Sequence, residues 1–130
     1  MAAIPDDVKD LLDSAVLAHV ATVTPGGSPR TSPMWFEWDG HNVLLSHTKA
    51  RAKYRDLQAN PRVALSIVDP QDPYRYVEIR GPVEIIDDPD KTLIHRLAKK
   101  YRGVDRYEWD GPGDHRVIFK VTPERVAPRR

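Results

Sequence analysis

Four basic side chains occupy alternate positions in a short segment that the sequence predicts to be helical: Lys49, Arg51, Lys53 and Arg55. Ala50, Tyr54 and Leu57 recur at the spacing of one helix face, and Thr48 is the expected N-cap. The positive charges then lie at the positive end of the helix macrodipole, where each costs about 0.3–1 kcal/mol. A bound anion would reverse this cost, because free backbone N–H groups and cationic side chains would both attract it. We therefore predict a phosphate or carboxylate site at residues 49–55, with a merely solvated basic face as the alternative.

Two other predicted helices have the opposite and more usual distribution of charge. The first begins with Asp6 and Asp7, and the last begins near Asp88 and Asp90. The last helix also ends in a basic turn that is followed by Gly103, as expected for a helix C-terminus. The contrast with the basic helix favours a ligand there over a charged surface without a role.

The composition limits the classes of function that the protein can have. The 130 residues fit one domain, residues 1–130, and 20 basic against 19 acidic residues oppose general nucleic-acid binding. The sequence has no cysteine, which excludes disulfides and thiol nucleophiles. No apolar run is long enough to span a membrane and no secretion signal is evident, so a cytoplasmic protein without a membrane partner is expected.

Several common catalytic and binding signatures are missing from the sequence. The five histidines show no metal-ligand spacing, so we predict no metal site, and His47 alone is a site candidate. We find neither a serine nucleophile motif nor a Rossmann or P-loop fingerprint. No catalytic residue can therefore be named from the sequence.

The alternation of apolar residues predicts a mainly β protein. Residues 16–24, 29–38 and 43–47 are expected to form a three-stranded meander, with a hairpin at Asp39-Gly40. Within the second of these strands, Met34, Phe36 and Trp38 share the face expected for the core. Trp35 points the other way, and it belongs either to packing or to the wall around a flat ligand.

The second half of the chain adds further strands. Residues 63–67 alternate, residues 74–86 form a long strand with a bulge or a bend at Gly81-Pro82, and residues 116–121 form the last strand. Residues 103–114 look irregular, and their aromatic residues are expected at a binding lip or a dimer contact. The tail, residues 123–130, is predicted to be a loose edge.

The order and spacing of several segments resemble one family. The matching segments are Gly27-Ser28-Pro29, Ser32-Pro33-Met34-Trp35-Phe36, Asp39-Gly40, Arg51-Ala52-Lys53, residues 57–65 and Glu78-Ile79-Arg80-Gly81. Over roughly residues 6–126 the chain resembles the split β-barrel flavin and deazaflavin oxidoreductases related to pyridoxamine 5′-phosphate oxidase. It looks most like the branch that uses the deazaflavin coenzyme F-420. The resemblance implies a six- or seven-stranded, mostly antiparallel split β-barrel with about three short helices, in the α+β class. It also implies a homodimer with cofactor sites at its interface.

The resemblance also implies which residues hold the cofactor. Arg51 and Lys53 match the basic residues that hold its phosphate, with Lys49 and Arg55 as support. The segment expected along the ring system is Thr31, Ser32, Pro33, Met34 and Trp35. The residues expected near the phosphate or the ribityl chain are Ser46, His47 and Thr48.

The function implied by the resemblance is hydride transfer from reduced coenzyme F-420 to a small conjugated or unsaturated organic substrate. Two alternatives remain open at this point: an FMN-dependent oxidoreductase of the same fold, and a non-catalytic protein that binds a cofactor or related ligand. The Arg-x-x-x-Trp substrate signature of pyridoxamine 5′-phosphate oxidase is missing near the C-terminus, so oxidation of pyridoxamine phosphate is not expected.

Overall fold

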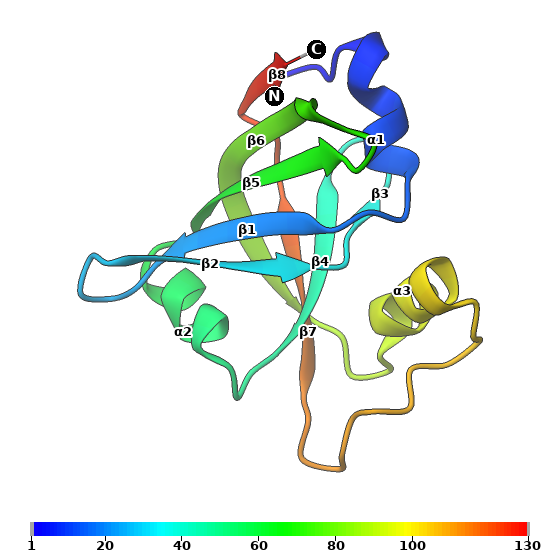
Figure 1. The fold of residues 1–130 in the computed structure, drawn as a ribbon. Coiled ribbons are helices and arrows are strands. Elements are labelled where there is room, and N and C mark those ends of the chain that lie inside the picture. Colours follow the sequence, from blue (N-terminus) through cyan, green and yellow to red (C-terminus); the bar gives the residue numbers. More distant parts are fainter. Residues whose placement is uncertain (1, 130) are drawn as a thin grey trace.

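A computed structural model describes residues 2–129, which form one antiparallel β structure with short helices at its periphery (Figure 1). The strands are β1 (Ala18–Val23), β2 (Pro29–Met34), β3 (Glu37–Trp38), β4 (Val43–Thr48), β5 (Arg62–Asp69), β6 (Asp72–Asp87), β7 (Arg116–Val121) and β8 (Arg125–Arg129). The helical elements are the 3-10 turn η1 (Asp6–Val8) and the α-helices α1 (Lys9–Asp13), α2 (Ala52–Ala59) and α3 (Thr92–Arg102). Both chain ends lie near α1 at one end of the molecule.

The long strand β6 connects the two halves of the sheet. The strand order is β2-β1-β5-β6-β7-β4-β3, with β8 also paired to β6. The first part of β6 pairs with β5 and β8, and residues 83–87 pair with β7. Buried residues of both halves, such as Leu65 and Phe119, belong to one core, so the sheet curls around it as a split barrel.

Strand β6 changes its pairing partner from β5 to β7 at Gly81-Pro82, the position where the sequence predicts a bulge or a bend. A Cβ atom at Gly81 would lie 1.8 Å from the backbone oxygen of Thr122. Only glycine permits this approach of two backbones, which places the start of β8 against β6.

Burial follows the alternation that the sequence predicts for the strands. Val63, Leu65 and Ile67 of β5 are buried, as are the inward residues of β7. Phe36 is fully buried, and Trp38 packs against the same core. The helices cover separate edges, because Leu57 of α2 enters the barrel core while Leu97 of α3 belongs to a second apolar cluster.

The expected strand at residues 29–38 and the expected meander are wrong, because the chain breaks at Trp35 and Phe36. Strand β2 pairs with β1, whereas β3 pairs with β4, and β4 lies between β3 and β7. The backbone of Phe36 is satisfied by α3 instead of a strand: its N–H donates to the Tyr101 hydroxyl and its carbonyl accepts from Lys100 Nζ. This break turns Trp35 toward α3.

Two further expectations are corrected by strand pairing. Residues 125–129 are not a loose edge, since β8 pairs with residues 76–80 of β6. Thr48 is not a helix N-cap, because it ends β4 in register with Arg116 of β7 and is 5% exposed. The basic helix therefore begins later than predicted, at Ala52, and Arg51 is its N-cap residue.

The N-terminus of α3 offers a test of local stability. The Asp88 carboxylate accepts hydrogen bonds from the backbone N–H groups of Thr92 and Leu93, at 3.1 and 3.0 Å. Asp88→Ala should lower the free energy of unfolding by about 0.5–2 kcal/mol, as loss of a cap does. Urea denaturation measures the change, and Asp88→Asn, which keeps an acceptor oxygen, should lose less. Equal stability of Asp88→Ala and wild type would contradict the capping role.

Candidate functional site

Two adjoining hollows lie where β2, the end of β4 and the start of α2 meet. The larger, which we call the large cavity, has a volume of about 450 Å³ and is lined by Leu17, Ser32, Pro33, Met34, Trp35, Ser46, His47, Arg51, Ile94, Leu97, Tyr107 and Arg116. The smaller, the basic pocket, has a volume of about 200 Å³ and is lined by Arg30, Thr31, Ser32, His47, Arg51, Ala52 and Lys53. Because Ser32, His47 and Arg51 line both, the two hollows are immediate neighbours and together make one candidate site.

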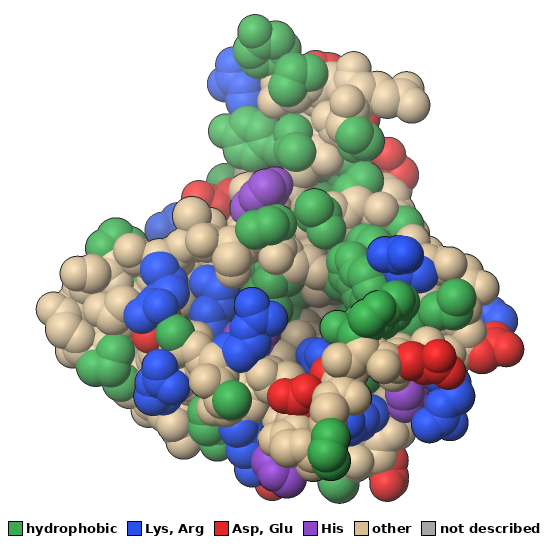
Figure 2. Space-filling view, turned by 60° about the horizontal axis from the view of Figure 1, so that its bottom comes forward, with side chains coloured by type: hydrophobic (Ala, Val, Ile, Leu, Met, Phe, Trp, Pro, Cys, Tyr) green, Lys and Arg blue, Asp and Glu red, His purple; other side chains and the backbone are tan. Residues whose placement is uncertain are grey.

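The site has one basic side and one apolar side. Figure 2 shows the hollowed centre of this face with Lys and Arg side chains gathered on the side of α2 and hydrophobic side chains on the side of α3. Such an arrangement suits a ligand with an anionic end and a flat apolar part.

Most of the residues predicted for a cofactor site come together here. Ser32, Pro33, Met34, Trp35, Ser46, His47 and Arg51 line the large cavity, and Thr31 and Lys53 line the basic pocket. The other three are not among the described residues that line either hollow. Thr48 is buried in the β4–β7 pairing, Lys49 forms an ion pair with Asp87 at 3.1 Å, and Arg55 is exposed on α2.

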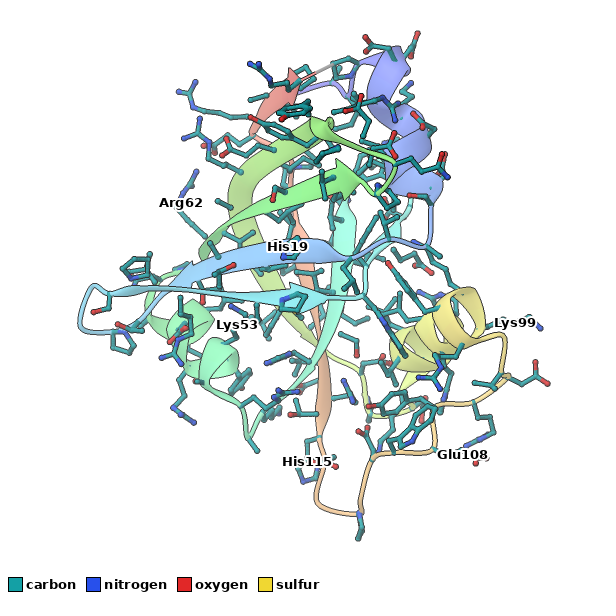
Figure 3. The ribbon with its side chains drawn as sticks, viewed as in Figure 1. His19, Lys53, Arg62, Lys99, Glu108 and His115 are labelled. Atoms are coloured by element: carbon teal, nitrogen blue, oxygen red, sulfur yellow. The ribbon has the colours of Figure 1, made fainter. Side chains whose placement is uncertain are left out.

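A buried network holds the cations of the basic pocket. Lys53 is only 5% exposed, and its Nζ donates to the backbone oxygen of Val20 at 3.0 Å (Figure 3). Asp56 is 1% exposed, and its Oδ2 accepts from Thr22 Oγ1 and pairs with Arg30 Nε, both at 2.8 Å. Burial lowers the pKa of Lys53 from its usual value, while the Asp56 carboxylate acts in the opposite direction.

The N-terminus of α2 opens on the basic pocket. Arg51, the N-cap residue, is extended, and among residues 2–129 no side chain caps this end of the helix. Ala52 in the first turn lines the pocket. First-turn N–H groups and nearby cationic side chains together make a site suited to an anion.

His47 is a neutral residue at the junction of the two hollows. It is 8% exposed, and burial together with the charges of Arg51, Arg116 and Lys53 lowers its pKa to about 4. The imidazole is therefore uncharged at neutral pH. It contributes hydrogen-bonding atoms to the site but no charge.

Ser46 has an unused hydrogen-bonding group at the cavity wall. The residue is 8% exposed, and its Oγ has no hydrogen-bond partner among the described residues. A buried hydroxyl without a partner is costly, so a polar atom of a ligand or a water is expected to pair with it.

Aromatic rings build the opposite wall. Trp35 stacks on Tyr101 with ring centres 5.1 Å apart and 8° between the planes, and Tyr107 meets Trp35 edge-on at 6.1 Å. The Tyr101 hydroxyl donates to the backbone oxygen of Val16, and burial raises its pKa to about 12. These contacts hold Trp35 in a fixed orientation. Trp35 therefore both packs against Tyr101 and Tyr107 and forms part of the cavity wall.

Several lining residues were not predicted as site residues. Arg30 shares a face of β2 with Ser32, and the alternation of a strand could have identified it. Ile94 and Leu97 have the spacing of a core-facing helix, so the sequence offers no signal for a cavity role. Arg116 is held by two hydrogen bonds to Asp110, at 2.8 and 2.7 Å. Asp110 lies in the irregular segment just before β7, where the sequence shows no periodic pattern that would predict this contact.

Residues 2–129 contain neither a metal-binding cluster nor a membrane-spanning helix. No group of three or more His, Asp or Glu side chains in this range could hold a metal ion. None of the helices described is long and apolar enough to cross a membrane.

Comparison with known proteins identifies the family. Residues 4–130 match the model of the pyridoxamine 5′-phosphate oxidase family, to which the chain therefore belongs. An F-420 reductase of known structure is 41% identical, with 95% of this chain and 98% of that chain covered and a TM-score of 0.85. No curated protein matches the sequence.

More distant structures share the fold alone. A conserved hypothetical protein of Mycobacterium tuberculosis is 22% identical, with 99% and 86% of the two chains covered and a TM-score of 0.76. The heme storage protein HutZ of Vibrio cholerae is 12% identical, with 98% and 96% covered and a TM-score of 0.70.

Proposed function

We propose that the protein is an oxidoreductase that uses reduced coenzyme F-420 to transfer a hydride to a small conjugated or unsaturated organic substrate. The observation that carries the proposal is that the basic pocket and an aromatic-walled cavity lie side by side and share Ser32, His47 and Arg51 in their walls. The 41% identity with an F-420 reductase supports the choice of this coenzyme.

The residues present fit a phosphorylated deazaflavin. Arg51, Lys53 and the open N-terminus of α2 would bind the phosphate, since they supply charge and hydrogen-bond donors in one place. Trp35 and the neighbouring residues of β2 offer a flat surface for the ring system. The unpaired Ser46 Oγ is available to a polar atom of the ring or the ribityl chain.

The chain's own groups bind, orient and exclude water, while reduced coenzyme F-420 supplies the hydride from its ring carbon when bound. The apolar side chains of Ile94 and Leu97 keep water from one side of the large cavity. Neither His47, with a pKa of about 4, nor Tyr101, with a pKa of about 12, is tuned to exchange a proton near neutral pH. We therefore assign binding and orientation, and no catalytic acid or base, to the residues of this site.

Fluorescence titration of the purified protein with coenzyme F-420 and, separately, with FMN tests the proposal. We expect micromolar or tighter binding of coenzyme F-420 and weaker binding of FMN. Preference for FMN would select the FMN-dependent alternative, and binding of neither would contradict the proposal. Tight binding without oxidation of the reduced coenzyme across a broad panel of acceptors would favour a non-catalytic binding protein.

We also propose that the protein is a homodimer with its cofactor sites at the interface, as the family resemblance implies. The large cavity is open on the single chain, so a second subunit would complete its wall. Light scattering coupled to size-exclusion chromatography measures the mass in solution, and a monomer would contradict this proposal.

The cytoplasmic location expected from the sequence stays a prediction.

A further inference from the structure

We propose that Arg30 is an anion-binding residue of the basic pocket, and that Asp56 is the positioning residue that holds Arg30 and Lys53 in place. The inference deepens the proposed function and rests on its assignment of the anionic group to this pocket. It concerns two residues that lie 26 positions apart in the sequence, on β2 and α2.

The contact between Arg30 and Asp56 leaves most of the guanidinium free for a ligand. Arg30 uses Nε to pair with Asp56 Oδ2 at 2.8 Å. Within residues 2–129, its two terminal amino groups have no further hydrogen-bond partner. The side chain is 42% exposed and lines the basic pocket, so these donors are accessible to an anion. Arginine suits such a role because its planar fork can bind two oxygens of one phosphate.

Asp56 is buried, and its negative charge is compensated by the neighbouring cations Arg30 and Lys53. A carboxylate that is 1% exposed would be very unfavourable without compensation. Here its Oδ2 accepts from Thr22 Oγ1, and the same hydroxyl oxygen accepts from Lys53 Nζ at 3.4 Å. Asp56 is thus connected directly to Arg30 and, through Thr22, to Lys53. The carboxylate also favours the charged form of Lys53 against the effect of burial on its pKa.

Two interpretations of Asp56 predict opposite changes in anion affinity. If Asp56 only happens to lie near the pocket, its negative charge repels the ligand, and removing the charge should tighten binding. If Asp56 positions the two cations, removing its charge should weaken binding, because Arg30 is released and Lys53 loses its compensating charge. The sign of the change therefore distinguishes the two.

The test compares Asp56→Asn and Arg30→Gln with wild type, using inorganic pyrophosphate and coenzyme F-420 as separate probes. Fluorescence of the protein and of the coenzyme reports binding, and urea denaturation reports folding. We expect each variant to bind roughly tenfold more weakly. The double variant should lose less than the two single losses combined, because part of the Asp56 effect acts through Arg30, while the rest acts through Lys53. Arg30→Lys, which keeps the charge on an exposed side chain, should recover part of the affinity even if Asp56→Asn folds poorly.

Arg62→Gln is the matched control, because Arg62 is an exposed arginine paired with Glu124 away from the pocket and its loss should leave both affinities unchanged. Tighter binding by Asp56→Asn, or unchanged binding by Arg30→Gln, would overturn the inference. If wild type binds pyrophosphate but no cofactor, the proposed function fails, while the pyrophosphate affinities of the variants still decide the roles of Arg30 and Asp56. If wild type binds neither probe, both fail.

Discussion

Replacing Arg51 with alanine is expected to weaken the binding of coenzyme F-420 by about 1.5–3 kcal/mol, the range for hydrogen bonds to charged groups. Arg51 is the N-cap residue of α2 and lines both hollows. The variant therefore removes a positive charge and hydrogen-bond donors from the wall that the two hollows share. The affinity measured by fluorescence titration should fall by a factor of about 10 to 150.

The Arg51 variant separates binding from stability. Arg51 is exposed, and removing its charge beside the N-terminus of α2 should leave the free energy of unfolding unchanged or raise it slightly. Lys53→Ala is a less selective test, because it also removes a buried hydrogen bond to Val20. Arg62→Ala, on an exposed pair with Glu124, serves as the control. Equal affinity of the Arg51 variant and wild type would contradict the role of Arg51.

The stability of the protein should fall in mild acid because of His47. Its pKa is lowered from 6.5 to about 4, mainly by burial, so the folded protein keeps the imidazole neutral while the unfolded chain becomes protonated. Protonation of the unfolded chain begins as the pH falls below 6.5, and the difference is complete below about 4. Wild type should therefore lose about 3 kcal/mol of unfolding free energy between pH 6.5 and pH 4 through this residue.

His47→Gln isolates this contribution, because glutamine does not titrate. Carboxylates such as Asp110, whose pKa is lowered mainly by its hydrogen bond to Arg116, lose their stabilising effect in acid in both proteins. Urea denaturation at pH values from 7 to 4 gives the free energy of unfolding of each protein as a function of pH. The difference between the slopes of the two curves is the contribution of His47. Parallel stability curves for wild type and His47→Gln would show that His47 becomes protonated in the folded state as readily as in the unfolded chain.

The local elements of the fold were predictable because the sequence patterns are periodic. Alternation at Val63, Leu65 and Ile67 identified β5, and the bend at Gly81 marked where β6 changes partners. The break at Phe36 was not predictable, because it depends on hydrogen bonds from Tyr101 and Lys100 on a helix more than 60 residues away. β8 was missed because its pairing with β6 is also a long-range contact.

In the candidate site, too, residues within one sequence segment were predictable, whereas contacts between segments far apart in the sequence were not. The resemblance placed residues 31–35 together with residues 46–49 and the basic residues 51, 53 and 55, and the structure brings most of them to one pair of hollows. Lys53 was expected to hold the cofactor phosphate, and the structure adds that its side chain is buried, with Nζ hydrogen-bonded to the Val20 carbonyl of β1 and to Thr22. The side chains of α3 that complete the cavity have the pattern of an ordinary core, so only the folded arrangement reveals their second role.

The most direct measurement is a crystal structure of the protein with coenzyme F-420 bound. We predict that the phosphate will lie in the basic pocket within hydrogen-bond distance of Arg51, and that the ring system will lie in the large cavity against Trp35. A coenzyme bound with its ring system outside the large cavity, or with its phosphate beside Lys49 and Asp87 instead of Arg51, would contradict this assignment of the site.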